Sequence, residues 1–178
     1  MAAKVSVDIH DLTAEGSGVG RLPDGRAVFV PWTAPGDRVA IRVVEERERW
    51  CRGELVAVEV PAEGRREPRC TLYGRCGGCR LQHLRYRDQV AWKGRRLREV
   101  LRRIGDQDVP VPSVEPSDRE YGYRNRMSFT LRRLRGGRVV AGLHRVDAPE
   151  RVLDIRDECH LPEEGILQVW QRLRESWG

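Results

Sequence analysis

The sequence contains very little lysine. Of its 33 lysine and arginine residues, 31 are arginine, and Lys4 and Lys93 are the two lysines. Aromatic residues are also scarce, at 6% of the chain, and hydrophobic residues make up 39%. This composition supports a folded core and excludes a large one.

Long hydrophobic runs are absent as well. No stretch approaches 18 consecutive apolar residues, which argues against a helix that spans a membrane. The first five residues lack the apolar core of a secretory signal. The sequence therefore predicts a soluble, cytoplasmic chain with no membrane partner.

The charge is unevenly distributed along the chain. The net charge is +6, but residues 1–60 hold 8 cations and 10 anions, whereas residues 65–103 hold 13 cations and 3 anions. Guanidinium groups bind phosphate in a bidentate manner and lose water readily. A polyanion, above all a nucleic acid, is therefore the first partner to consider, although an arginine-rich protein also uses such residues on solvated faces.

The first sixty residues have the pattern of short β-strands. Residues 5–9 alternate between apolar and polar, and residues 27–30, 39–44 and 55–60 are short runs rich in β-branched residues. Glycine- and proline-containing turns separate them. This spacing favours a small closed barrel over alternating strands and helices.

One glycine cluster could be confused with a nucleotide-binding loop. Gly16, Gly18 and Gly20 have a suitable spacing, but residues 21–25 form a turn where a phosphate-binding helix would have to begin. We therefore interpret these glycines as part of a bulged or tightly curved strand.

The remainder of the chain alternates between helical and extended patterns. A polar linker at 61–68 precedes the cysteines, and residues 87–104 are predicted to form an amphipathic helix. Strands are predicted at 127–131, 139–143 and 152–155, and a final helix begins near Glu163. The apolar stripes of the two helices consist of Val90, Leu97, Val100, Leu101 and Ile104, and of Ile166, Val169, Trp170, Leu173 and Trp177.

Three cysteines within ten residues give the sharpest chemical signal. Cys70, Cys76 and Cys79 are closely spaced, and Gly77-Gly78 lets the backbone turn the last two sulfurs toward one centre. In a chain without a secretory signal, this spacing indicates a metal before disulfides. Cys159 is the best candidate for a fourth ligand, whereas Cys51 lies in a predicted strand, where a buried thiol is expected.

Zinc and iron–sulfur chemistry both fit these ligands. Thiolates select either of the two, and His83 could complete a Cys₃His zinc site with the three clustered cysteines. The spacing alone does not separate a zinc ion from an iron–sulfur cluster.

The run from Cys70 to Leu84 resembles the cluster motif of the 23S rRNA (uracil-5-)-methyltransferases. Residues 11–37 resemble the TRAM domain of that family, and residues 123–129 with 159–162 resemble the start of its central domain. The resemblance implies a 4Fe–4S cluster held by Cys70, Cys76, Cys79 and Cys159. It also implies an RNA partner, with rRNA favoured. We expect the chain to be a monomer.

The same resemblance implies that part of the family's sequence is missing. Family members are more than twice this length, and their SAM-binding fold, nucleophilic cysteine and general base lie in a C-terminal domain. We therefore expect SAM to bind only through that missing domain, and this chain alone to be inactive. The alternatives are a stand-alone TRAM RNA-binding iron–sulfur protein without catalysis, and a redox protein built on the cluster.

The expected fold is mainly β. A five-stranded, OB-like TRAM barrel at residues 1–61 precedes a cluster loop and basic helix at 62–105, and residues 106–178 begin an incomplete central β-rich domain with a small antiparallel sheet. The candidate RNA-binding residues are cations of the helix and of the central domain. They are Lys93, Arg95, Arg96, Arg98, Arg102, Arg103, Arg124 and Arg126.

Overall fold

The computed structural model describes residues 4–177, which form two compact units. The barrel unit consists of residues up to 67 together with 83–116, and the cysteine unit consists of 68–82 together with 117–177. The cysteine-rich loop thus groups with the C-terminal part of the chain and the basic helix groups with the barrel. The three-segment organisation expected from the sequence stays a prediction.

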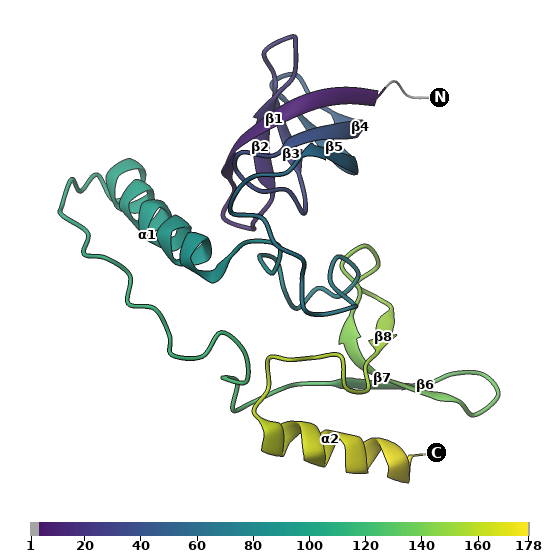
Figure 1. Cartoon of the computed structure of the whole chain (residues 1–178). Coiled ribbons are helices and arrows are strands. Elements are labelled where there is room, and N and C mark those ends of the chain that lie inside the picture. Colours follow the sequence, from purple (N-terminus) through teal and green to yellow (C-terminus); the bar gives the residue numbers. More distant parts are fainter. Residues whose placement is uncertain (1–3, 178) are drawn as a thin grey trace. The chain divides into compact units, whose positions relative to one another are not determined.

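Five strands close into a barrel at the start of the chain (Figure 1). Their order is β1-β2-β3-β5-β4, with β4 pairing back onto β1. β5 runs parallel to β3, and the other neighbours are antiparallel. The strands are β1 (Lys4–Leu12), β2 (Gly18–Arg21), β3 (Ala27–Val30), β4 (Arg38–Glu46) and β5 (Trp50–Val60). The predicted five-stranded barrel is confirmed.

The barrel interior is filled by inward-pointing aliphatic side chains, with Val28, Val30 and Ile41 fully buried. β2 comes so close to its neighbours that a side chain on it would collide with the core. A Cβ built on Gly18 would lie 1.9 Å from Thr33 Oγ1, and one on Gly20 would lie 2.3 Å from Val7 Cγ1. Gly18 and Gly20 therefore lie in a strand, as predicted, where no side chain would fit, whereas Gly16, with a φ of 82°, lies in the turn before it.

The basic helix α1 (Tyr86–Arg103) lies within one residue of its predicted bounds. Its apolar stripe, however, is only partly packed. Trp92 is its one buried residue, while Leu97 is 47% and Ile104 is 78% exposed. Helical periodicity predicts that an apolar face exists, but it does not supply the surface that covers it.

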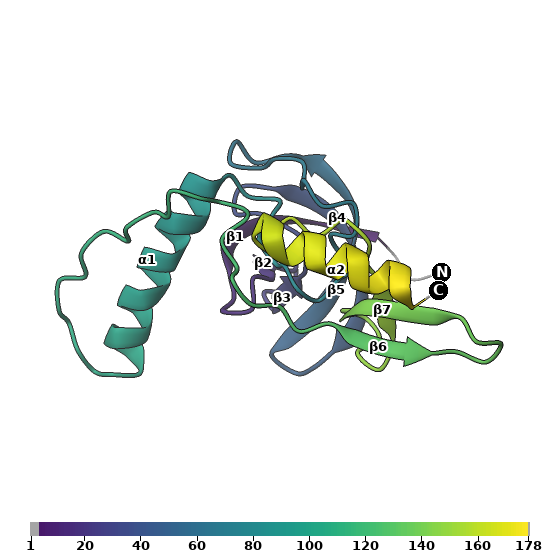
Figure 2. The ribbon, with the colours of Figure 1, turned by 90° about the horizontal axis from the view of Figure 1, so that it is seen from below.

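The cysteine unit contains a three-stranded antiparallel sheet and a helix (Figure 2). The sheet is formed by β6 (Thr130–Arg133), β7 (Val139–His144) and β8 (Val152–Asp154), and the helix is α2 (Glu164–Ser176). The Trp170 ring stacks on Phe129 with centroids 3.9 Å apart, and its Nε1 donates to Ile155 O at 3.0 Å. Arg174 donates to Asp154 Oδ1 at 2.7 Å and to Ala141 O at 3.0 Å, which fixes α2 to the sheet.

One prediction for this unit is partly wrong. The strand expected at 127–131 begins only at Thr130, because Phe129 packs on Trp170 and residues 127–129 have no paired neighbour. α2 carries the predicted apolar stripe, in which Trp170 is buried while Val169 and Leu173 are 57% and 42% exposed. No helix within residues 4–177 is long and apolar enough to cross a membrane.

Candidate metal centre and nucleic-acid interface

Tight turns shape the cysteine-rich loop. Tyr73 N–H donates to Cys70 O at 3.1 Å, and Cys76 N–H donates to Leu72 O at 2.9 Å. Gly77 N–H then donates to His144 O at 3.0 Å, at the end of β7. A Cβ on Gly77 would lie 3.3 Å from that same carbonyl oxygen, so glycine lets the loop lie directly against the sheet.

Backbone hydrogen bonds also position Cys159. His160 O accepts from Gly122 N–H at 2.9 Å, and Leu161 O accepts from Arg124 N–H at 3.0 Å. Before it, Ile155 is 1% exposed and its N–H donates to Ala141 O. Cys159 is thus held between two anchored segments, 80 residues after Cys79.

The four cysteines expected as ligands line one largely enclosed cavity of the cysteine unit. All four are free thiols, and Cys76 and Cys159 are buried. The rest of the wall is mainly apolar, with a few polar groups. It consists of Leu72, Tyr73, Gly78, Gln82, Arg124, Leu143, Ile155, His160 and Leu161.

The cavity is electrostatically unfavourable for free thiolates. Burial raises the pKa of the Cys70, Cys79 and Cys159 thiols, and negative charge on neighbouring cysteines raises it further. Gln82 and the Arg124 guanidinium oppose this rise in the pKa of Cys79. A bound cation would supply the positive charge that these sulfurs need in order to deprotonate.

A single-ion site is not formed by these side chains. Across residues 4–177, no three His, Cys, Asp or Glu side chains gather closely enough to hold one metal ion. His83, the candidate fourth zinc ligand, is 1% exposed, and its Nε2 lies 2.9 Å from Thr33 O in the barrel unit. Four soft sulfur donors in an apolar cavity nonetheless fit the chemistry of a multi-iron cluster.

Cys51 lies apart from these sulfurs. It is in β5 with 0% of its surface exposed, and it belongs to the aliphatic core of the barrel. The prediction of a small buried thiol is confirmed.

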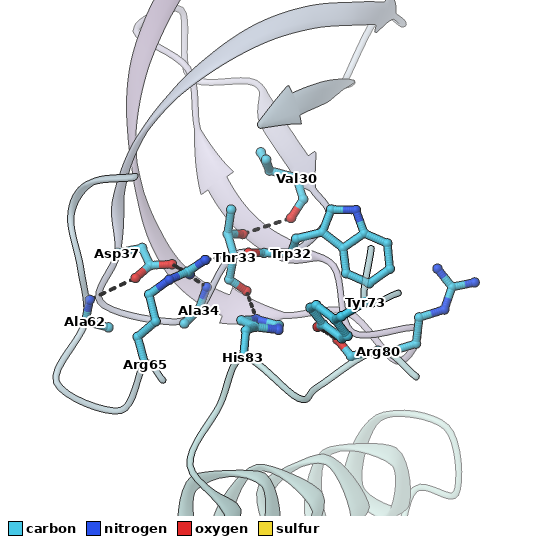
Figure 3. Close-up of polar contacts among 10 residues, drawn as sticks. All are labelled: Val30, Trp32, Thr33, Ala34, Asp37, Ala62, Arg65, Tyr73, Arg80 and His83. Carbon is cyan, nitrogen blue, oxygen red and sulfur yellow. Dashed lines mark hydrogen bonds and ion pairs between the residues drawn. The ribbon is translucent and has the colours of Figure 1, made fainter. Parts of the chain in front are cut away.

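A buried polar network fixes the segments that join the barrel to α1 (Figure 3). The Asp37 carboxylate, 1% exposed, accepts hydrogen bonds from Ala34 N–H at 2.7 Å and Ala62 N–H at 2.8 Å. Arg65 Nη1 donates to the same carboxylate at 2.5 Å. Because every contact is within hydrogen-bond distance, this buried charge is compensated. The backbone of Arg65 also forms an isolated antiparallel β-bridge with Leu84, just before α1.

The same network holds an unusual backbone conformation at Trp32. Its φ of 67° is rare for a bulky residue and costs about 1–3 kcal/mol. The Trp32 carbonyl accepts from Arg65 Nη2 at 3.2 Å, and Thr33 Oγ1 donates to Val30 O at 2.8 Å (Figure 3). His83 contacts Thr33 O, as above, so contacts on both sides determine this turn.

The candidate RNA-binding cations divide between the two units. Six of them are on α1, where Lys93, Arg95, Arg98, Arg102 and Arg103 are exposed and Arg96 is partly exposed. Arg96 and Arg103 each lie 3.9 Å from a Glu99 carboxylate oxygen, so part of their charge is neutralised.

Arg124 and Arg126 belong to the cysteine unit. Arg126 is exposed, but Arg124 is partly buried and lines the cysteine cavity. Gln82, which the ligand prediction omitted, lines it too and accepts from Cys70 N–H at 3.2 Å. Its position three residues after Cys79 was the available sequence signal.

Comparison with known proteins identifies the barrel. The TRAM domain family matches residues 3–56. Across 97% of its length, the chain is 39% identical to the 23S rRNA (uracil(1939)-C(5))-methyltransferase RlmD of Thiobacillus denitrificans. It is 34% identical to an uncharacterized RNA methyltransferase of Listeria innocua across 96% of its length. The chain spans 39% and 37% of the lengths of these two curated relatives.

A solved structure has the same fold over most of the chain. The Pyrococcus abyssi tRNA (uracil-54, C5)-methyltransferase, in complex with S-adenosyl-L-homocysteine, aligns with a TM-score of 0.59 and 24% identity. The alignment covers 95% of this chain and 36% of that one.

Proposed function

Since the chain carries a TRAM domain and is homologous over nearly its whole length to RNA (uracil-5-)-methyltransferases, we propose that it is the RNA-recognition and iron–sulfur portion of a SAM-dependent 23S rRNA (uracil-5-)-methyltransferase. Its catalytic domain belongs to the part of such proteins that these 178 residues do not span. The observation that carries the proposal is the joining of a TRAM barrel to four cysteines that line one cavity.

Cys70, Cys76, Cys79 and Cys159 are the residues that would hold the 4Fe–4S cluster. Bound there, it would act as a structural staple between the loop at 68–82 and the segment around Cys159. Leu143, Ile155 and Leu161 give the cavity an apolar wall, and the Arg124 guanidinium would offset negative charge on Cys79. Gly78 N–H, 3.4 Å from Cys76 Sγ, donates to that sulfur.

The cluster proposal is tested by metal content. The chain purified without oxygen should be brown and contain about four iron and four sulfide per chain. Each single cysteine-to-serine variant should lose most of the iron. The four positions are Cys70, Cys76, Cys79 and Cys159. The matched control, Cys51→Ser, should retain it, because Cys51 is in the barrel core. Stoichiometric zinc in a colourless protein would overturn the proposal.

RNA recognition is assigned chiefly to α1. Arg95, Arg98 and Arg102 are exposed, and a helix that presents guanidinium groups suits the phosphate backbone. Release of condensed counterions gives such binding a steep salt dependence. Contacts of this kind can offset the cost of moving a target uridine out of its stack.

The test of the α1 assignment is the salt dependence of RNA binding. Replacing Arg95, Arg98 and Arg102 together with glutamine should lower the slope of log K against log salt by about two units for single-stranded RNA. A matched control is the triple glutamine variant of Arg133, Arg135 and Arg138, which are exposed arginines at the hairpin between β6 and β7 and should leave the slope unchanged. If the α1 variant retained the wild-type slope, α1 would not be the RNA face.

A further inference from the structure

The barrel presents an aromatic patch on its outer surface, formed by β2, β3 and β5. Val28 and Val30 of β3 are fully buried, so Phe29 between them points outward. On β5, Cys51 is buried and the preceding Trp50 points outward in the same way.

Strand register brings these outward residues together. β3 and β5 run in parallel, with Ala27 opposite Trp50, and Phe29 is also opposite Val19 of β2. The rings of Phe29 and Trp50 have centroids 5.9 Å apart and an interplanar angle of 55°. Both residues are partly exposed. The aromatic patch therefore consists of Val19, Phe29 and Trp50.

The charge around the aromatic patch is balanced. Arg26 donates to Asp24 Oδ2 at 2.7 Å and to Glu46 Oε2 at 3.1 Å. Arg52 Nε lies 3.7 Å from a Glu45 carboxylate oxygen. Because carboxylates already pair with these two guanidinium groups, Arg26 and Arg52 offer little to a phosphate. The patch itself offers the apolar area of its two rings.

We propose that the aromatic patch stacks an unpaired base of single-stranded RNA. The inference rests on the proposed role in RNA recognition and adds a second contact of different physical character to the one on α1. The second and third strands of an OB-type barrel are a face suited to oligonucleotides. Removing one ring on which a base stacks weakens single-strand binding by about 5- to 150-fold.

Stacking and phosphate contacts respond differently to salt. Counterion release depends on phosphates, whereas stacking on a ring does not change the number of ions released. Loss of the aromatic patch should therefore lower affinity by the same factor at every salt concentration. Loss of the α1 arginines should instead change the slope.

The experiment measures anisotropy of a labelled oligouridylate and of a blunt RNA duplex across a salt series. The variant Phe29→Leu/Trp50→Leu should bind the single strand at least 5-fold more weakly, with the wild-type slope and unchanged duplex affinity. Phe29→Tyr/Trp50→Phe, which keeps both rings, should bind within about 2-fold of the wild type. Val44→Ala removes apolar surface from β4, where Val44 is 54% exposed, and should change nothing.

Unchanged affinity of the leucine variant, a reduced slope, or an equal loss on the duplex would each overturn the stacking role. Circular dichroism checks that the variant is folded. Ultraviolet crosslinking of the wild type should place uridine on a peptide containing Phe29 or Trp50, and crosslinks confined to other peptides would also overturn it. A wild-type chain that bound no RNA would refute the proposed function itself. If only the α1 variant lost RNA affinity, the stacking role would be refuted and the proposed function would stand.

Discussion

Proton uptake is unfavourable at His83, whose ring is 1% exposed in the barrel unit. Burial lowers the pKa of this imidazole from its ordinary 6.5, and the nearby Arg65 guanidinium lowers it further, against the opposing effects of Thr33 O and Asp37. Because Thr33 O can only accept, Nε2 carries the proton of the neutral ring.

The first prediction concerns the pH dependence of stability. Below pH 6.5 the unfolded chain binds a proton at His83 that the folded chain does not, so the free energy of unfolding should fall as pH falls. The loss is at most about 1.4 kcal/mol per pH unit. His83→Gln keeps an N–H donor and should flatten this fall in urea unfolding between pH 8 and pH 5. His10→Gln, at an exposed position, is the control. Equal pH dependence of His83→Gln and the wild type would contradict the assignment.

At the scale of residues, the sequence identified candidate functional side chains, but it did not predict which residues they contact. Cys70, Cys76 and Cys79 are conspicuous from spacing alone. Asp37, in contrast, follows Pro35 and Gly36 in an ordinary turn sequence, and its role depends on Ala62 and Arg65, which fold back onto its carboxylate. Such long-range contacts leave no local pattern in the sequence.

Two glycines in different elements should respond oppositely to alanine. In β2, the methyl group of Gly18→Ala would clash with Thr33, whose hydroxyl already donates to Val30 O and whose side chain is fully buried. We expect a loss of about 1–3 kcal/mol. In α2, Gly165 has open space around its Cβ position, so Gly165→Ala should stabilise by up to about 1 kcal/mol. Urea denaturation of both variants measures this, and a neutral Gly18→Ala would show that β2 relaxes freely.

Strands and helices could be predicted well where a periodic apolar pattern has another segment of the chain to pack against. The barrel strands alternate because one face is inside. The strand predicted at 27–30 is confirmed and β4 extends the one predicted at 39–44, whereas β5 begins at Trp50, before its predicted start at 55. The strand at 127–131 shortened because Phe129 packs on a helix that comes later in the chain. The stripe of α1 is real as a pattern, but Leu97 and Ile104 remain exposed in the described residues. Periodicity reports amphipathic character and not the identity of the covering surface.

At the scale of the whole molecule, we expect residues 1–178 alone to transfer no methyl group. The chemistry that the resemblance implies needs a thiolate that can reach uracil C6. Cys51 is fully buried in the barrel, and the other four cysteines line one cavity. Labelled SAM with unmodified ribosomal RNA is the assay. Label at uracil C5 would show that the catalytic groups are within this chain.

The cysteine unit is assembled from two pieces of chain, residues 68–82 and 117–177, with part of the barrel unit encoded between them. Because of this order, the ribosome synthesises Cys159 well after the three clustered cysteines. At about 5–20 residues per second of synthesis, Cys159 emerges about 4–16 s after Cys79. Throughout that delay the nascent loop carries three thiols without the wall formed by Ile155, Cys159 and Leu161. Oxidants therefore reach these thiols most easily while the protein is still being made.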